Sequence, residues 1–187
     1  MRNPRRHSRG LVKPWQFESR PLGAEDVEIK ISHCSTDVHT IDSGWGSTAF
    51  PCVAGHKMVG EVTLVGPKVT YLAVGDRIGV GAQVFACLNK DKAKHCVECA
   101  DGADTYCSPT LSQYDDGHPT RGEYADYVHV LSHYAFKIPE VTLSDAAAPL
   151  LCAGVAVFTP LKQSGIKAGD RSIHARGAIP VALFSTT

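Results

Sequence analysis

The sequence lacks a net charge, a secretory leader and any internal repeat. Its 187 residues contain 19 basic and 19 acidic side chains, so the formal charge at pH 7 is zero. This balance argues against a protein that binds nucleic acid or a membrane surface through bulk charge. No signal-peptide core and no apolar run of membrane-spanning length stand out. We therefore expect a cytoplasmic protein with neither nucleic acid nor a membrane as its partner.

Acidic residues are also missing from the start of the chain. No Asp or Glu precedes Glu18, whereas arginines occupy positions 2, 5, 6 and 9. Mitochondrial targeting segments share this arginine content, but they also have an amphipathic apolar face, which this segment lacks. A disordered basic arm over residues 1–14 is therefore the interpretation we favour.

What the chain does contain is enough apolar sequence for a buried core, with 43% hydrophobic and 20% charged residues. Short apolar runs that alternate with polar residues or are interrupted by glycine predict strands. They occupy residues 26–32, 57–66, 75–84 and 124–139. Strands of this length and punctuation are typical of a small β-barrel.

Beyond Pro139 the sequence becomes rich in alanine and leucine. Thr142 and Ser144 are candidate helix caps, and Gly165 is a natural stop. We expect two short helices in this region, broken near Pro149.

The seven cysteines are an odd number, which favours thiol or metal chemistry in a reducing compartment over a disulfide framework. Cys96, Cys99 and Cys107 are spaced C-x2-C-x7-C, and Cys87 lies eight intervening residues upstream. Four thiolates can close a tetrahedron around zinc and leave no open position for catalysis. The surrounding lobe, residues 86–108, has little apolar surface to bury, so a metal would supply its order.

Two other functions of this cluster remain open at this point. A C-x2-C pair can be a redox centre, although the strand-to-helix context of such motifs is missing. A nucleic-acid zinc finger is a further alternative, but no basic recognition helix follows the cluster. A structural zinc site is the interpretation we favour.

Several motifs occur in an order that resembles one enzyme family. They are CSTDVH (34–39), GHKMVGEV (55–62), GDRIGVGAQV (75–84), the cysteine lobe, GEYADYV (122–128) and AAPLLCAGVAVFTPL (147–161). The set resembles the zinc-dependent medium-chain alcohol dehydrogenases, nearest their NADPH-using cinnamyl alcohol dehydrogenase branch, over about residues 15–171. This resemblance implies a mainly β, GroES-like, partly open barrel with a few helices, one catalytic zinc and one structural zinc.

The resemblance assigns a second metal site. Cys34, His56 and Cys152 match the three protein ligands of the catalytic zinc, whose fourth position takes water or the substrate oxygen. Cys152 follows Pro149 at what reads as a helix start, where the helix dipole would favour the thiolate. Without the motifs, a cysteine in an alanine-rich helix would be read as a small core residue.

The same comparison gives roles to residues around that site. Asp37 matches the carboxylate that holds the ligating His56 in one tautomer. Thr36 matches the hydroxyl that accepts the alcohol proton, and His39 matches the histidine that passes the proton to solvent. Trp45 lies in the region that lines the substrate pocket. Cys87, Cys96, Cys99 and Cys107 match the structural zinc ligands.

Two departures from the family pattern affect the metal sites. Lys57 replaces a glutamate that lies behind the catalytic zinc, and a cation there opposes the charge of the metal unless it turns outward or pairs with a carboxylate. The family usually has two residues between its first and second structural cysteines. The eight found here indicate a six-residue insertion near residues 89–94.

The third departure is the end of the chain. After GIKAGDR (165–171) the family continues into a glycine-rich dinucleotide-binding unit, and no G-x-G-x-x-G follows here. We expect a catalytic domain at residues 15–165, a stub at 166–187 and no coenzyme domain. The NADP(H) site and the dimer contacts would then be missing, and apolar surface would be exposed.

Two functions follow from these expectations. The first is a zinc-dependent alcohol dehydrogenase or aldehyde reductase that exchanges hydride with NADP(H) on aromatic or medium-chain primary alcohols and aldehydes. The second is a truncated, catalytically inactive zinc-binding domain.

Overall fold

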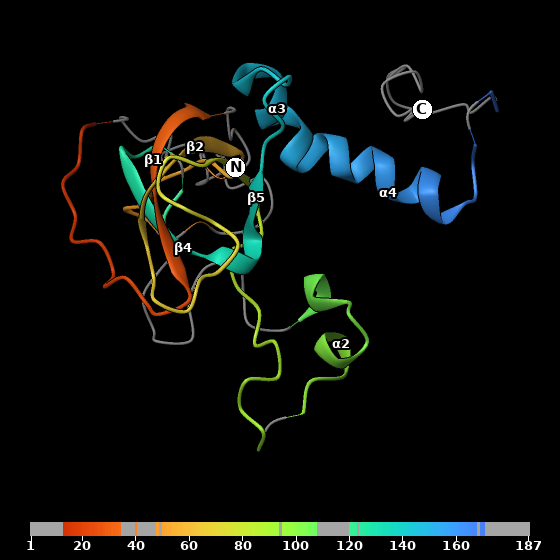
Figure 1. Cartoon of the computed structure of the whole chain (residues 1–187), viewed down its shortest axis with the longest axis horizontal. Coiled ribbons are helices and arrows are strands. Elements are labelled where there is room, and N and C mark those ends of the chain that lie inside the picture. The colour runs from red at the N-terminus through yellow and green to blue at the C-terminus, as the bar shows by residue number, and fades with distance from the viewer. Residues whose placement is uncertain are drawn as a thin grey trace, which may run out of the picture.

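The computed structural model describes residues 13–34, 40, 48, 50–93, 95–107, 120–122, 124–167 and 169–170. Within these ranges, five antiparallel strands form one sheet in the order β4-β1-β2-β3-β5. Their bounds are β1 Asp26–Cys34, β2 Met58–Val65, β3 Arg77–Val80, β4 Tyr127–Leu131 and β5 Ala135–Lys137. Figure 1 shows this curved half-barrel with the cysteine lobe on one side and a helical arm on another. The mainly β architecture expected from the sequence is confirmed.

The strands form because their apolar residues alternate and meet across the sheet. In β1, Val27 and Ile29 are fully buried, whereas Glu28 between them is half-buried and Lys30 after them is exposed. Val27 lies opposite Val130 of β4 on one side and Val65 of β2 on the other. Side chains with a period of two therefore fill the inside of the barrel, which burial of apolar surface stabilises.

Gly60 allows β1 and β2 to approach each other closely. A Cβ atom added at this position would lie 2.3 Å from the carbonyl oxygen of Lys30 and 2.6 Å from a side-chain carbon of Ile29. Any larger residue would push the two central strands apart. The glycine within the β2 sequence therefore has a packing role.

A buried ion pair fixes the segment that precedes β1. The guanidinium of Arg20 lies 2.6 Å from Oδ2 of Asp26, and their side chains are 11% and 3% exposed. The backbone amide of Gly23 donates a hydrogen bond to the same carboxylate oxygen. These contacts hold residues 20–23 against the start of β1. Most of the predicted basic arm, residues 1–12, falls outside the described residues.

The helical region is continuous, so the break expected near Pro149 is wrong. Helix α3 (Ser144–Pro149) passes directly into a π-helical segment, η4 (Leu150–Gly154), and then into α4 (Val155–Gln163). Proline cannot donate to the helix ladder. Here the wider π segment follows the proline, and the backbone keeps helical dihedral angles through it.

The expected caps are also corrected. The residue at the N-cap of α3 is Leu143, and no side chain caps the helix there. At the other end, the predicted stop at Gly165 is confirmed. Gly165 has a φ of 70° and donates to the carbonyl of Lys162, while Ile166 donates to that of Leu161. These two bonds form the Schellman motif that ends many helices.

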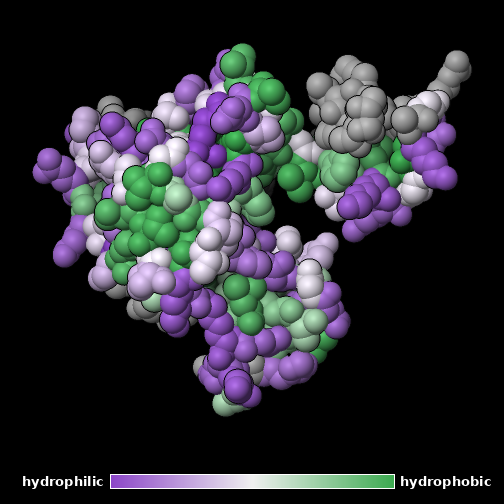
Figure 2. Space-filling view, viewed as in Figure 1, coloured by the Kyte–Doolittle hydropathy of each residue, from purple (hydrophilic) through white to green (hydrophobic). Residues whose placement is uncertain are grey.

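Much of the helical arm is exposed. Ala147 and Ala148 of α3 are buried against Val59 of β2, but α4 has no buried residue. Leu150, Val155 and Phe158 are 44%, 55% and 40% exposed, and Figure 2 shows apolar surface where the arm leaves the barrel. The expected exposure of apolar side chains is therefore present in this region.

Helical continuity also corrects an expectation about membranes. Residues 144–163 form one 20-residue helix that is long and apolar enough to cross a bilayer by length and composition. A single such helix is weak evidence, because core helices of soluble proteins meet the same criterion. Its α3 end packs against β2, and 17% of its apolar window is buried.

Candidate metal centres

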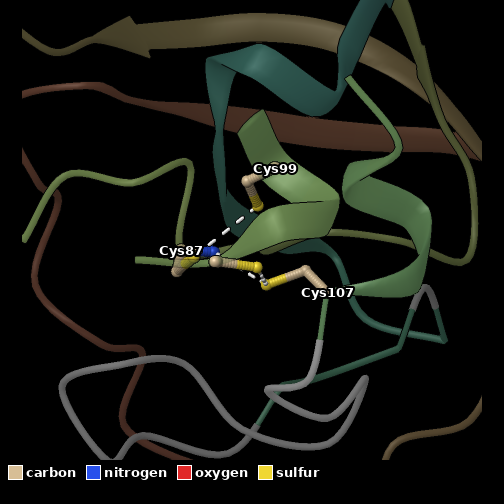
Figure 3. Close-up of side chains that lie close together, drawn as sticks. Cys87, Cys99 and Cys107 are labelled. Atoms are coloured by element: carbon tan, nitrogen blue, oxygen red, sulfur yellow. Dashed lines mark hydrogen bonds between the residues drawn. The ribbon is translucent and has the colours of Figure 1, made fainter. Parts of the chain in front are cut away.

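Four cysteine side chains converge in the lobe between β3 and β4. The ligand atoms of Cys87, Cys96, Cys99 and Cys107 all lie within 4.8 Å of one another. The Sγ atoms of Cys87 and Cys99 are 3.6 Å apart, and those of Cys96 and Cys107 are 3.9 Å apart. Figure 3 shows the side chains of Cys99 and Cys107 directed toward Cys87. Thiolates about 2.3 Å from a tetrahedral zinc are separated by about 3.8 Å, so the cage fits this ion.

Local backbone structure places the four sulfurs. Cys96 is the N-cap residue of the short helix α2 (Val97–Ala100), and Cys99 lies within this helix. Cys107 follows η2 (Asp104–Tyr106), a 3-10 helix of one turn. Neither α2 nor η2 contains a buried residue. The lobe packs against the main core through Ala86, Leu88, Cys99 and Cys107. The expected shortage of apolar burial in the lobe is thus confirmed.

The thiols of the cage have different proton affinities. A hydrogen bond from the backbone amide of Asn89 is the main cause that lowers the pKa of Cys87. Burial raises the pKa of Cys107. The amide of Cys99 lowers the pKa of Cys96, but the Glu98 carboxylate, burial and the neighbouring thiols together raise it to about 12. The Sγ atom of Cys96 donates a hydrogen bond to Oε2 of Glu98 at 3.1 Å. A metal ion that binds Cys96 must displace this proton.

Contacts that the sequence pattern did not indicate attach this lobe to the barrel. The hydroxyl of Tyr134 donates to Oδ2 of Asp104 at 2.8 Å, and Gln83 donates to the Asp104 carbonyl at 2.9 Å. Tyr134 is buried, and this burial together with Asp104 raises the pKa of its hydroxyl. Lys90 forms an ion pair with Glu25 at the start of the barrel. No spacing rule could have found these residues, because their partners lie far away in sequence.

The sheet topology brings the predicted catalytic ligands to one end of the barrel. Cys34, the last residue of β1, lies opposite Met58, the first residue of β2. His56 lies two residues before Met58, and Val80 at the end of β3 is the other neighbour of Met58. Two of the three ligands therefore leave the sheet at adjacent positions.

The third ligand comes from the helical arm. Leu151, next to Cys152, packs with α3 against Val59 of β2. The carbonyl oxygen of Leu151 also lies 2.6 Å from the position that a Cβ atom would take at Gly81, just after β3. The arm thus approaches the sheet at the end where β1 and β2 place Cys34 and His56.

The side chains at this end are less closely gathered than those of the four-cysteine cage. Within the described part of the chain, the group of three or more candidate ligands that lie within 4.8 Å is the cage, and Cys34, His56 and Cys152 are not members of it. The Nε2 atom of His56 is fully buried, Cys34 is exposed and Cys152 is half-buried. Two thiols and an imidazole are a suitable donor set for zinc, and this ligand set remains a prediction.

The position of Cys152 differs from the expected one. It lies inside the π segment of the continuous helix and not at a helix start. The prediction that a helix N-terminus stabilises the Cys152 thiolate is therefore wrong, since the helix dipole acts within the first turn. π-Helical segments within α-helices are, however, frequent at functional sites.

Several predicted site residues fall outside the described residues. These are Thr36, Asp37, His39 and Trp45. Lys57 is described and is half-buried immediately before β2. None of the seven cysteines lies in a disulfide.

A curved antiparallel barrel, a four-cysteine lobe and a cysteine-bearing helix define the class of GroES-like dehydrogenase domains. Residues 23–140 match the model of the alcohol dehydrogenase GroES-like domain, and the chain belongs to this family. Its resemblance to the cinnamyl alcohol dehydrogenase branch is supported by both sequence and structure.

Three relatives illustrate the similarity. The NADP-dependent alcohol dehydrogenase 6 of Saccharomyces cerevisiae is 41% identical over 165 residues, which are 85% of this chain and 45% of the relative. Cinnamyl alcohol dehydrogenase 1 of Capsicum annuum is 38% identical over 93% of this chain and 50% of its own. A cinnamyl alcohol dehydrogenase structure from Sorghum bicolor has a TM-score of 0.76 and 35% identity, covering 85% of this chain and 46% of that one. The chain thus spans about half the length of the relatives it matches.

Proposed function

We propose that Cys87, Cys96, Cys99 and Cys107 bind one structural zinc ion. The main support is the size of the cage. Its two sulfur–sulfur distances, 3.6 and 3.9 Å, lie on either side of the separation expected for thiolates around a tetrahedral zinc ion. With four protein ligands the ion has no open position. Its role would be to order a lobe that buries almost no apolar surface.

We further propose that Cys34, His56 and Cys152 are the protein ligands of a catalytic zinc. Support comes from Cys34 and His56, which lie at adjacent strand ends, from Leu151 beside Cys152, which packs against the same sheet, and from the buried Nε2 atom of His56. A zinc ion held there with one open position would act as a Lewis acid toward an alcohol or aldehyde oxygen.

The protein side chains would then handle the proton and the position of the ligands. Thr36 would accept the alcohol proton, and His39 would pass it to solvent. Asp37 would hold the imidazole of His56 in the tautomer that binds metal. Trp45 would line the substrate pocket. Lys57 would lower the affinity for the cation unless its ammonium group turns away.

The reaction we propose is the interconversion of a primary alcohol and its aldehyde, with hydride exchanged with NADP(H). The names of the relatives, an NADP-dependent alcohol dehydrogenase and cinnamyl alcohol dehydrogenases, support this class. Aromatic or medium-chain alcohols are the proposed substrates. Seven cysteines outside disulfides fit a reducing compartment such as the cytoplasm.

A second candidate function concerns residues 1–187 taken by themselves. The chain aligns with only 45–50% of its relatives, and the dinucleotide site expected for hydride transfer has no matching motif in its sequence. In this candidate function the chain is a zinc-binding domain without dehydrogenase activity of its own.

Zinc stoichiometry tests the metal proposals. Purified protein should contain two zinc ions per chain, and Cys152→Ala and Cys99→Ala should each contain one. Elemental analysis with protein quantified by amino-acid analysis gives the ratio. A wild-type value of one that Cys152→Ala leaves unchanged would contradict the catalytic site and leave the structural one intact.

NADPH consumption with an aromatic aldehyde separates the two candidate functions. The first predicts turnover by the wild type that Cys152→Ala abolishes. The second predicts no turnover, although two zinc ions are bound.

A further inference from the structure

The cage closes in spite of an unusually long connection between its first two cysteines. Eight residues separate Cys87 from Cys96, yet both sulfurs belong to one group within 4.8 Å. A flexible loop of this length would not by itself return Cys96 to a fixed point. Some contact must close the base of the loop.

The side chain of Asn89 makes that contact. Its Nδ2 donates to the carbonyl oxygen of Cys96 at 3.0 Å, and its Oδ1 accepts from the backbone amide of Cys96 at 2.8 Å. One side-chain amide thus pairs with both backbone groups of a metal-ligand residue. Of the standard side chains, asparagine and glutamine alone combine a donor and an acceptor in this planar arrangement, and asparagine is the shorter.

The backbone turns so that Asn89 can reach Cys96. The amide of Lys90 donates to the carbonyl of Cys87 at 3.0 Å. Leu88 and Asn89 have φ values of 49° and 51°, which gives both central residues of this four-residue turn the left-handed conformation. Asparagine tolerates that conformation better than most residues do.

The segment between Asn89 and Cys96, here called the excursion, begins and ends at these two hydrogen bonds, and its described residues, 90–93 and 95, are exposed. Lys90, Asp91, Lys92, Ala93 and His95 are exposed, while Asn89 and Cys96 are half-buried. If the excursion is removed, Cys87, Leu88, Asn89 and Cys96 become consecutive and give a C-x2-C spacing. The geometry therefore places the insertion one residue later than the expected 89–94.

We propose that Asn89 is a positioning residue for the four-cysteine metal site. Its amide closes the excursion and holds the backbone of Cys96, so that residues 90–95 do not perturb the cage. This inference rests on the proposed structural zinc site. Residues that orient metal ligands without binding the metal typically change metal affinity by about 10-fold to 100-fold when they are removed.

Asn89→Gly is the direct test, because glycine accepts the left-handed backbone and removes the side chain that carries the amide. We would measure cobalt(II) binding through its thiolate charge-transfer and ligand-field absorption, all in a Cys152→Ala background so that only the cage is titrated. Asn89→Gly should weaken cobalt binding about tenfold. Asn89→Gln, which keeps the amide on a longer side chain, should recover part of this loss.

Deletion of residues 90–95 supplies the matched control. In the deleted chain the cysteines have a C-x2-C spacing, so the same Asn89→Gly substitution should change cobalt affinity less than about twofold. If Asn89→Gly reduced cobalt affinity equally in the full chain and in the deleted chain, Asn89 would not act by closing the excursion. Its role would then be merely structural. No loss in the full chain would overturn it as well.

Failure of the underlying metal site has a different result. The Cys152→Ala parent would then show no thiolate-to-cobalt absorption, and a further Cys99→Ala change would make no difference. If Asn89→Gly reduces folding, as measured by circular dichroism without metal, Asn89→Asp provides the second comparison. It keeps the acceptor for the Cys96 amide and loses the donor, so its cobalt affinity should lie between those of wild type and Asn89→Gly.

Discussion

The two candidate metal centres are assembled in opposite ways. The four-cysteine cage comes from one short stretch, residues 87–107, and is gathered by turns, a four-residue helix and one side-chain clamp. Cys34, His56 and Cys152 come from two strand ends and a helix, separated by more than a hundred residues. The local cage depends on its own turns and on the metal it would bind, whereas the second set depends on the whole barrel. The difference indicates that damage to the lobe should stay local and damage to the barrel should reach both sites.

Breaking the cage should have the largest effect on the lobe. Cys99→Ala leaves three thiols, and bound structural zinc contributes on the order of 10 kcal/mol to the folding of small zinc peptides. We expect α2 and η2 to lose hydrogen-exchange protection while the barrel strands keep theirs. Cys52→Ala, outside both proposed sites, is the control. Unchanged protection in α2 would show that the lobe does not need its metal.

Breaking the buried ion pair should affect the barrel and therefore both centres. Asp26→Ala leaves Arg20 charged and buried, and removal of one partner of such a pair costs about 3–5 kcal/mol. Urea unfolding, followed by the strand signal in circular dichroism, measures this loss. Lys137→Ala removes the partner of an exposed pair with Asp76 and should cost less than about 1 kcal/mol. Similar losses of unfolding free energy in Asp26→Ala and Lys137→Ala would contradict a stabilising role for the buried Arg20–Asp26 pair.

Loosening the join between lobe and barrel should have an intermediate effect. Tyr134→Phe removes the hydroxyl that donates to Asp104, and a hydrogen bond to a charged group contributes about 1.5 kcal/mol or more. We expect faster proteolysis of the lobe and a small loss of overall stability. Tyr127→Phe, at a 43% exposed position, is the matched control. Equal proteolysis rates would show that the join does not restrain the lobe.

The smallest expected effect is a change in how folding stability depends on acid pH, and it concerns Glu28. Burial raises the pKa of Glu28, but hydrogen bonds from His129 and Thr63 outweigh it and leave this pKa below its usual value. A lowered folded-state pKa gives stability that is present above the unfolded value of 4.5 and lost as pH falls through the folded value.

Glu28→Gln should therefore reduce stability at neutral pH by about 1 kcal/mol or less and flatten its loss below pH 4.5. Thermal unfolding between pH 3 and 7 would show both changes. Glu61→Gln, on the exposed face of β2, is the control. If Glu28→Gln left the loss of stability in acid unchanged, Glu28 would not be a cause of that loss.

The barrel was largely predictable because its rules are local. Alternation of apolar residues such as Val27 and Ile29 identified the strands, and the C-x2-C spacing identified the cage. The helical arm was predicted less well. Pro149 indicated a break, but the π segment after it continues the helix, and a pattern of residue types does not encode that change of pitch.

The supporting contacts could not be predicted from the sequence. Asn89 and Tyr134 have ordinary positions in the sequence, and their roles appear only when Cys96 and Asp104 are brought to them. Asn89 lies seven residues from its partner and Tyr134 thirty. Such pairs depend on tertiary structure, which overrides local propensity.

The clamped excursion also makes the lobe a permissive site for engineering. Because the chain leaves and returns at one pair of hydrogen bonds, we expect the sulfur positions to tolerate changes in length and composition between Asp91 and His95. A peptide epitope or a dye-labelling tag spliced there would project into solvent beside a spectroscopically addressable metal. The loop could then report metal loading without disturbing the ion it reports on.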